Sequence, residues 1–122
     1  MYKNDLIERT KIFAHRSVKL ALLLPDTRLG NHIQGQLIRC STSVAANYRA
    51  SCVALSKKSF IAKISIVIEE VDESNFWLFF IKDENLLPGN KELEDLIIES
   101  AEQTSIFISS RKTAQQNLIK KD

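Results

Sequence analysis

The chain has 122 residues, 26% of them charged, and a formal net charge of +2 at pH 7. A compact chain of this length buries enough surface to fold without a metal or a disulfide, and the two cysteines, Cys40 and Cys52, lie in no metal-ligand pattern. Because the N-terminus does not resemble a secretory signal and no apolar run approaches the roughly 20 residues that span a bilayer, we expect one cytoplasmic domain over residues 1–122, with no membrane contact.

Four segments with apolar residues at steps of three and four, the period of an α-helix, follow one another along the chain. They predict helices at about residues 4–24, 31–52, 56–84 and 91–118. Pro25 and Pro88 fall in the breaks between them, and Ser56 is a suitable N-cap for the third helix. Four such helices joined by short turns predict an all-α fold, an antiparallel up-down-up-down four-helix bundle.

The second and third helices each carry a second face, opposite the predicted core. On the second helix this face is made of small residues and arginines: Gly35, Arg39, Thr42, Ala46 and Arg49. Gly and Thr are poor helix formers, so their presence on an outer face favours close approach by another helix. On the third helix the outer face combines bulky apolar groups with carboxylates: Ile66, Glu69, Glu73, Trp77 and Phe80. We expect these two faces of neighbouring subunits to contact each other and to close a ring.

The stretch Phe76–Ile81, FWLFFI, is apolar around the whole helix circumference. A monomeric bundle would leave part of it exposed as an aromatic patch, which supports an oligomer. The alternative is that Trp77 and Phe80 pack within one subunit. The protein is then a monomer or an isologous dimer.

Charge is unevenly distributed along the chain. Residues 1–68 carry a net charge of +8, residues 69–106 carry −9, and residues 107–122 carry +3. Two explanations stay open: pairing between basic and acidic helices, within or between subunits, or a surface that binds nucleic acid. Some basic residues are the least expected to form such ion pairs, and they are the candidate nucleic-acid contacts. They are Arg49, Lys57, Lys58 and Lys63, together with the tail 111–121.

Signals for catalysis are weak. His15 and His32 have no Cys or Asp partner at ligand spacing, and no phosphate-binding loop, nucleophile elbow or HExxH motif occurs. A di-metal bundle site needs Glu-x-x-His pairs, and no His follows a Glu at that spacing. We therefore expect a non-enzymatic protein without a cofactor, a metal site or a small-molecule substrate.

The span Gln36–Leu78 resembles the signature of bacterial four-helix bundle proteins first noted in intervening sequences of 23S ribosomal RNA genes. The matching elements are Gln36–Arg39, then Ser43, Val44 and Ala46–Arg49, then Ser59, Phe60 and Lys63, and lastly Glu70, Asp72 and Glu73 leading to Trp77 and Leu78. The chain departs from the pattern at Ala45, where the family usually has Gly, and at Ala50, where Glu is frequent. The second change removes a salt-bridge partner for a neighbouring basic residue.

The resemblance implies a left-handed bundle and a homopentameric ring. It also connects the chain to the accessory protein of diversity-generating retroelements, a basic pentamer that binds nucleic acid and a reverse transcriptase. We therefore expect an oligomeric scaffold whose partners are copies of itself and RNA, DNA or a reverse-transcriptase-like protein. The alternative is a purely structural or protein-binding bundle without a nucleic-acid contact.

Overall fold

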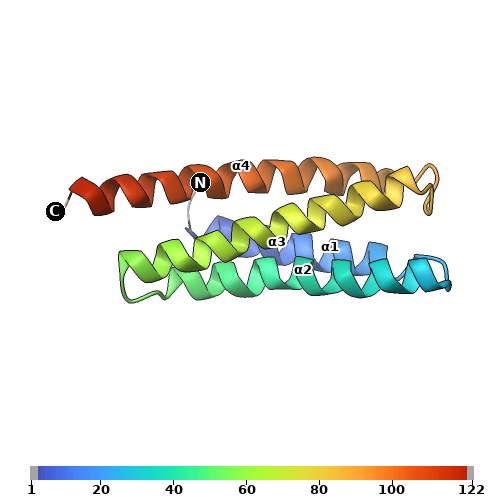
Figure 1. The fold of residues 1–122 in the computed structure, drawn as a ribbon, viewed down its shortest axis with the longest axis horizontal. Helices are drawn as coiled ribbons and strands as arrows, with labels where there is room; N and C mark the ends of the chain where they lie inside the picture. The colour runs from blue at the N-terminus through green and yellow to red at the C-terminus, as the bar shows by residue number, and fades with distance from the viewer. Residues whose placement is uncertain (1–2, 121–122) are drawn as a thin grey trace.

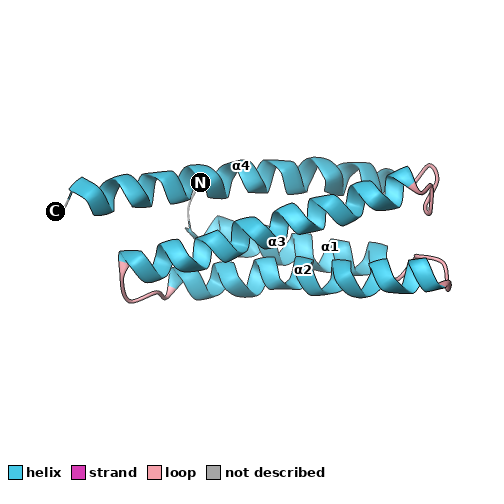
Figure 2. Ribbon diagram, in the orientation of Figure 1, coloured by secondary structure: helices cyan, strands magenta, loops and turns pink. Residues whose placement is uncertain are grey.

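The structure, a computed structural model, describes residues 3–120. These residues form four helices and no strand: α1 (Lys3–Ala21), α2 (Arg28–Cys52), α3 (Lys57–Asp83) and α4 (Lys91–Lys120) (Figure 2). Consecutive helices pack on each other and run in opposite directions (Figure 1). The predicted all-α four-helix bundle is confirmed, and its left-handedness stays a prediction. Within the described residues, no helix has the length and hydropathy needed to cross a membrane.

The core contains one apolar stripe from each helix, at the steps of three and four that the sequence shows. Its largest fully buried apolar side chains are Phe13, Leu20, Ile33, Leu37, Val44, Ile64, Val67, Leu78, Ile81, Leu96 and Phe107. Burial of such side chains is the main force that holds the helices together, at roughly 1.5–3 kcal/mol for each one. The spacing of apolar residues therefore accounts for both the helices and their packing.

The first helix is shorter than predicted, because it ends at Ala21 rather than near residue 24. Pro25 disfavours the helical conformation of the residue before it. The backbone N–H of Leu23 accordingly donates to the carbonyl of Leu20 at 3.0 Å, and that of Leu24 to the carbonyl of Ala21 at 3.1 Å, in tight turns. The side chain of Leu24 stays buried, so the apolar stripe continues beyond the end of the helix.

The second helix begins at Arg28, three residues earlier than predicted, because Thr27 caps it. The Thr27 hydroxyl accepts a hydrogen bond from the backbone N–H of Gly30 at 3.0 Å. A Cβ atom on Gly30 would lie 2.0 Å from the carbonyl oxygen of Pro25. Glycine is therefore required where the α1–α2 turn crosses the first turn of α2.

The third helix has the predicted N-cap, since the Ser56 hydroxyl accepts a hydrogen bond from the N–H of Ser59 at 3.1 Å. Its C-terminus is a Schellman motif, with Asn85 in the left-handed conformation (φ 53°) and a hydrogen bond from the N–H of Leu86 to the carbonyl of Ile81 at 3.1 Å. The N–H of Leu93 then donates to Asn90 Oδ1 at 2.9 Å at the start of α4. Local capping thus sets both ends of this connection.

The helices differ in length, and this shapes one end of the bundle. The α2–α3 turn and the last turns of α4 extend beyond the first residue of α1 (Figure 1). Of the four neighbouring helix pairs, α1 and α4 also make the fewest contacts. The end at the α2–α3 turn also carries unpaired basic residues, which are described below.

Candidate assembly and nucleic-acid surfaces

The outer face of α2 is exposed along its length. The five residues predicted to form it, Gly35, Arg39, Thr42, Ala46 and Arg49, all face solvent. Apart from its chain neighbours and the nearby backbone of its own helix, no described heavy atom lies within 4 Å of the position that a Cβ atom of Gly35 would occupy. Among residues 3–120, the face is therefore open at Gly35.

Arg39 is held within its own chain at the seam between α2 and α3. Its Nη1 atom lies 3.1 Å from Glu70 Oε2, and its Nη2 atom makes a short ion pair with Glu73. The indole N–H of Trp77 donates to the same Glu73 carboxylate at 3.1 Å. The hydrogen bond between Arg39 and Glu73 lowers the pKa of Glu73 and raises the pKa of Arg39. Arg39 and Glu73 therefore stabilise the α2–α3 pair of one chain.

The predicted outer face of α3 divides into two parts. Ile66 and Glu69 are exposed as expected, whereas Glu73, Trp77 and Phe80 are half-buried. The Trp77 ring lies edge-on to His32, with 5.6 Å between the ring centroids. Part of the aromatic stretch thus packs within one chain, as the monomer alternative requires.

The exposed aromatic residues are Phe76 and Phe79, which are 54% and 43% exposed. They belong to a stripe in which every residue is exposed and the steps are three and four: Glu69, Asp72, Phe76, Phe79 and Asp83. We name these five residues the acidic-aromatic stripe. The sequence predicted Glu69 on the outer face and a surplus of aromatic groups, but it did not single out Phe76 and Phe79, although their spacing from Glu69 could have revealed them.

An open groove of about 540 Å³ runs between α1 and α2. Its floor is formed by small and apolar residues, and its rim by basic ones: Ile7, Lys11, Ala14, His15, Val18, Thr42, Ala45, Ala46 and Arg49. We name it the α1–α2 groove. Three residues of the predicted α2 face therefore contribute to it, while Gly35 and Arg39 do not. The contribution of α1 had no recognisable signal in the sequence.

Part of the charge asymmetry is resolved by ion pairs between helices. Arg9 Nε lies 2.6 Å from Glu99 Oε2, and Arg16 Nη2 lies 2.8 Å from Glu92 Oε1, so α1 is tied to α4. Burial acts to raise the pKa of Glu99, but the hydrogen bonds from Arg9 and Gln103 outweigh it and the pKa is lowered. Pairing with the acidic segment thus involves three arginines of the basic first half: Arg9, Arg16 and Arg39.

The predicted nucleic-acid residues have no ion pair with any residue in 3–120, but the structure does not gather them into one patch. Arg49 lines the α1–α2 groove, whereas Lys57 lines a separate hollow at the end of the bundle. Lys58 is exposed and Lys63 is half-buried on α3, outside both cavities. In the tail, Lys112 and Lys120 are exposed, Arg111 donates to Ser65 Oγ at 3.3 Å, and Lys121 lies outside the described residues.

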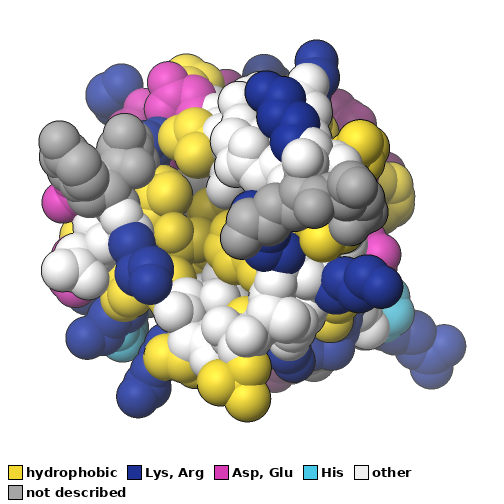
Figure 3. Space-filling view, turned by 90° about the vertical axis from the view of Figure 1, so that its left-hand side faces the viewer, with side chains coloured by type: hydrophobic (Ala, Val, Ile, Leu, Met, Phe, Trp, Pro, Cys, Tyr) yellow, Lys and Arg dark blue, Asp and Glu magenta, His cyan; other side chains and the backbone are white. Residues whose placement is uncertain are grey.

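The end of the bundle at which α3 begins and α4 finishes is rich in basic side chains. Figure 3 shows Lys and Arg around this end and hydrophobic side chains between them. A hollow of about 420 Å³ opens here. We name it the end hollow, and its lining residues are Lys3, Ser51, Cys52, Ala54, Leu55, Ser56, Lys57, Phe60, Ala114 and Asn117.

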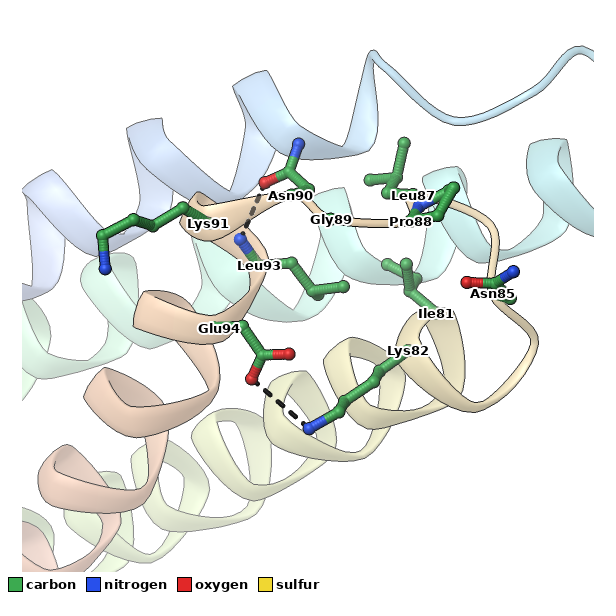
Figure 4. A pocket seen from close by; sticks show the side chains of 10 residues that line it. All are labelled: Ile81, Lys82, Asn85, Leu87, Pro88, Gly89, Asn90, Lys91, Leu93 and Glu94. Carbon is green, nitrogen blue, oxygen red and sulfur yellow. Dashed lines mark hydrogen bonds and ion pairs between the residues drawn. The ribbon is translucent and has the colours of Figure 1, made fainter.

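The opposite end has a cavity of about 520 Å³ at the α3–α4 turn (Figure 4). Its polar groups are largely occupied by local structure: Lys82 Nζ lies 3.3 Å from Glu94 Oε2, and Asn90 caps α4. Figure 4 shows the Ile81 and Leu93 side chains between these contacts. This cavity therefore belongs to the packing of the turn.

The described residues contain no group of three or more His, Cys, Asp or Glu side chains that could hold a metal ion. Cys40 is buried, and burial raises the pKa of its thiol to about 11, so it stays neutral near pH 7. Its sulfur accepts a hydrogen bond from Ser74 Oγ at 3.2 Å. Cys52, by contrast, is half-buried in the wall of the end hollow.

No known family model matches the chain, and no curated protein is similar to it. A solved structure does resemble it: a crystal structure of a protein of unknown function from the S23 ribosomal protein family of Bacteroides thetaiotaomicron. The TM-score is 0.82 at 28% sequence identity, and the match covers 92% of this chain and 99% of the other. The two proteins therefore share their fold over almost their whole length.

Proposed function

We propose that this protein is a non-enzymatic scaffold that assembles with copies of itself into a pentameric ring and contacts nucleic acid with its basic end. We also infer that the chain is a distant member of the 23S rRNA intervening-sequence proteins. The shared fold with an S23 family protein and the motif elements of Gln36–Leu78 support this relationship.

The observation that carries self-assembly is the match between two surfaces of the same chain. The acidic-aromatic stripe presents Phe76 and Phe79 between carboxylates, and the α1–α2 groove presents a floor of small residues with Lys11 and Arg49 at its rim. Aromatic groups of one copy would be buried in the groove of the next, with opposite charges facing each other. Because the two surfaces differ, the contact is heterologous and closes into a ring when the rotation allows it.

Self-assembly is tested by the mass of the wild-type protein and of the double variant Phe76→Ser with Phe79→Ser, measured by sedimentation. We expect a mass of several subunits for the wild type and a much smaller one for the variant. The matched control is Leu22→Ser with Leu23→Ser, which removes two equally exposed apolar side chains (62% and 61%) from the α1–α2 turn. A monomeric wild type would overturn the proposal.

The nucleic-acid contact is supported by the basic residues that remain without a partner. Lys57 and Lys58 pair with no residue in 3–120, although the acidic residues of α3 and α4 neutralise other cations. Clustered cations bind phosphates by releasing counterions, so binding should weaken steeply as salt rises. Changing Lys57, Lys58 and Lys63 together to Ala should remove most binding to a labelled oligonucleotide at low salt.

A protein that retains no RNA or DNA at low salt would be the purely structural or protein-binding bundle, which is the alternative function. In that case a reverse-transcriptase-like protein stays the partner to test, by co-purification of the two chains. The oligomer is common to both functions, so the sedimentation result does not depend on this outcome.

A further inference from the structure

The end hollow lies beside the first residue of α1 and the α2–α3 turn. The helix α1 begins at Lys3, while the first turn of α3 and the last turns of α4 continue past it (Figure 1). The walls of the hollow therefore come from the ends of α2, α3 and α4, with Lys3 at its edge. Hydrophobic side chains are visible between Lys and Arg at this end (Figure 3).

Three kinds of side chain meet in this hollow. Phe60 supplies a half-buried aromatic ring, and Asn117 supplies a solvent-exposed amide that has no hydrogen-bond partner in residues 3–120. Lys3 and Lys57 supply cations, and the Lys3 ammonium is placed across the wall by its hydrogen bond to the carbonyl of Cys52 at 3.1 Å. An aromatic face, an amide edge and flanking cations are the groups that bind unpaired nucleotides.

We propose that the end hollow takes one unpaired base of a single-stranded nucleic acid. The base stacks on Phe60, the Asn117 amide hydrogen-bonds its edge, and the neighbouring phosphates lie against Lys3 and Lys57. A volume of about 420 Å³ is within the range of small-ligand sites. Bases inside a duplex are stacked and paired, so they cannot enter; the site therefore selects single strands. This inference rests on the proposed nucleic-acid contact.

The test compares a labelled single strand of about twelve nucleotides with its duplex, by fluorescence anisotropy at low salt. We expect the wild type to bind the single strand more tightly. Phe60→Leu keeps an apolar side chain but removes the stacking face, and should weaken single-strand binding by about tenfold while leaving duplex binding unchanged. Asn117→Ala should weaken binding to the single strand in the same selective way.

The matched control is Lys58→Ala, an exposed lysine that lies next to the hollow but does not line it. Loss of a phosphate contact should weaken single-strand and duplex binding by the same factor. Equal effects of Phe60→Leu on the two forms, or no effect on either, would overturn the base site while leaving the nucleic-acid surface in place. Failure to bind either form would overturn both.

Cys52 offers a readout inside the hollow itself, because it lines the wall and is half-buried. A bound single strand should slow the reaction of its thiol with a thiol-specific reagent, and the duplex should not. The same protection measured with adenosine monophosphate distinguishes a site for a base within a strand from a site for a free nucleotide. If adenosine monophosphate protects Cys52 at the concentration at which the single strand does, the hollow binds a mononucleotide and the single-strand proposal fails.

Discussion

The guanidinium of Arg39 on α2 and the carboxylate of Glu73 on α3 are paired within one chain, and the indole of Trp77 donates to the same carboxylate. This arrangement joins two helices whose outer faces the sequence marks as assembly surfaces. It also gives Glu73 two partners within its own chain.

We expect Arg39→Ala to lower the free energy of unfolding by no more than about 1 kcal/mol, because the Arg39 side chain is 50% exposed and solvent screens the pair. The pKa of Glu73 is lowered in the folded state, so its contribution is present at neutral pH and is lost as the pH falls through that lowered pKa. Urea unfolding at pH 7 and at pH 3 should therefore show a smaller difference between variant and wild type at the lower pH. The mass of the assembly should not change.

Gly30 and Gly35 form a matched pair for a stability test. Ala at position 30 would place a Cβ atom against the carbonyl oxygen of Pro25, so we expect Gly30→Ala to lower the free energy of unfolding by roughly 1–3 kcal/mol. Gly35 has open space and lies inside α2, so Gly35→Ala should raise it by about 0.5–1 kcal/mol. Thermal unfolding measures both. A destabilising Gly35→Ala would show that a neighbouring subunit packs on this position.

The α1–α2 groove can be tested on its floor. Ala46→Glu places a carboxylate where the acidic-aromatic stripe is proposed to dock, and we expect the assembly to dissociate to smaller species. Ala101→Glu makes the same change at an exposed position of α4 and should leave the mass unchanged. Light scattering at equal protein concentration measures the mass of the assembly that each variant forms. Equal masses for the two variants would contradict docking in the groove.

The two cysteines should differ in reactivity. Cys52 is half-buried, so a thiol reagent at about pH 8 should modify it in the folded protein. Burial raises the pKa of the Cys40 thiol to about 11, and it should react only when denaturant is added. Mass spectrometry of the labelled protein counts the modified sites. Labelling of Cys40 without denaturant would show that the α2–α3 core opens.

The helices themselves were predictable from the apolar period, and most boundaries agree within a few residues. The error at the start of α2 arose from a missed Thr27 cap, and the error at the end of α1 from the conformational limit that Pro25 sets on Leu24. Thr27 and Pro25 were both visible in the sequence as signals of a helix boundary. Each signal is local, however, and the apolar stripe that continues through the turn obscures it.

The candidate surfaces were predicted less completely. The outer face of α2 is exposed as expected, yet only its C-terminal part, Thr42, Ala46 and Arg49, belongs to the α1–α2 groove. On α3, a stretch that is apolar around its circumference gives no periodic signal to show which aromatic residues pack inward. Trp77 lies against His32, and Phe76 is left exposed, because of the way α3 crosses α2.

The sequence by itself determined the four helices, the core stripes and the outer face of α2, because a 3.6-residue period records which side of each helix leaves water. Only the tertiary structure decided which charges are paired, that Phe76 and Phe79 are exposed, and that a hollow lies beside Phe60 and Asn117. These features depend on the relative positions of residues on different helices, and packing between the helices sets those positions.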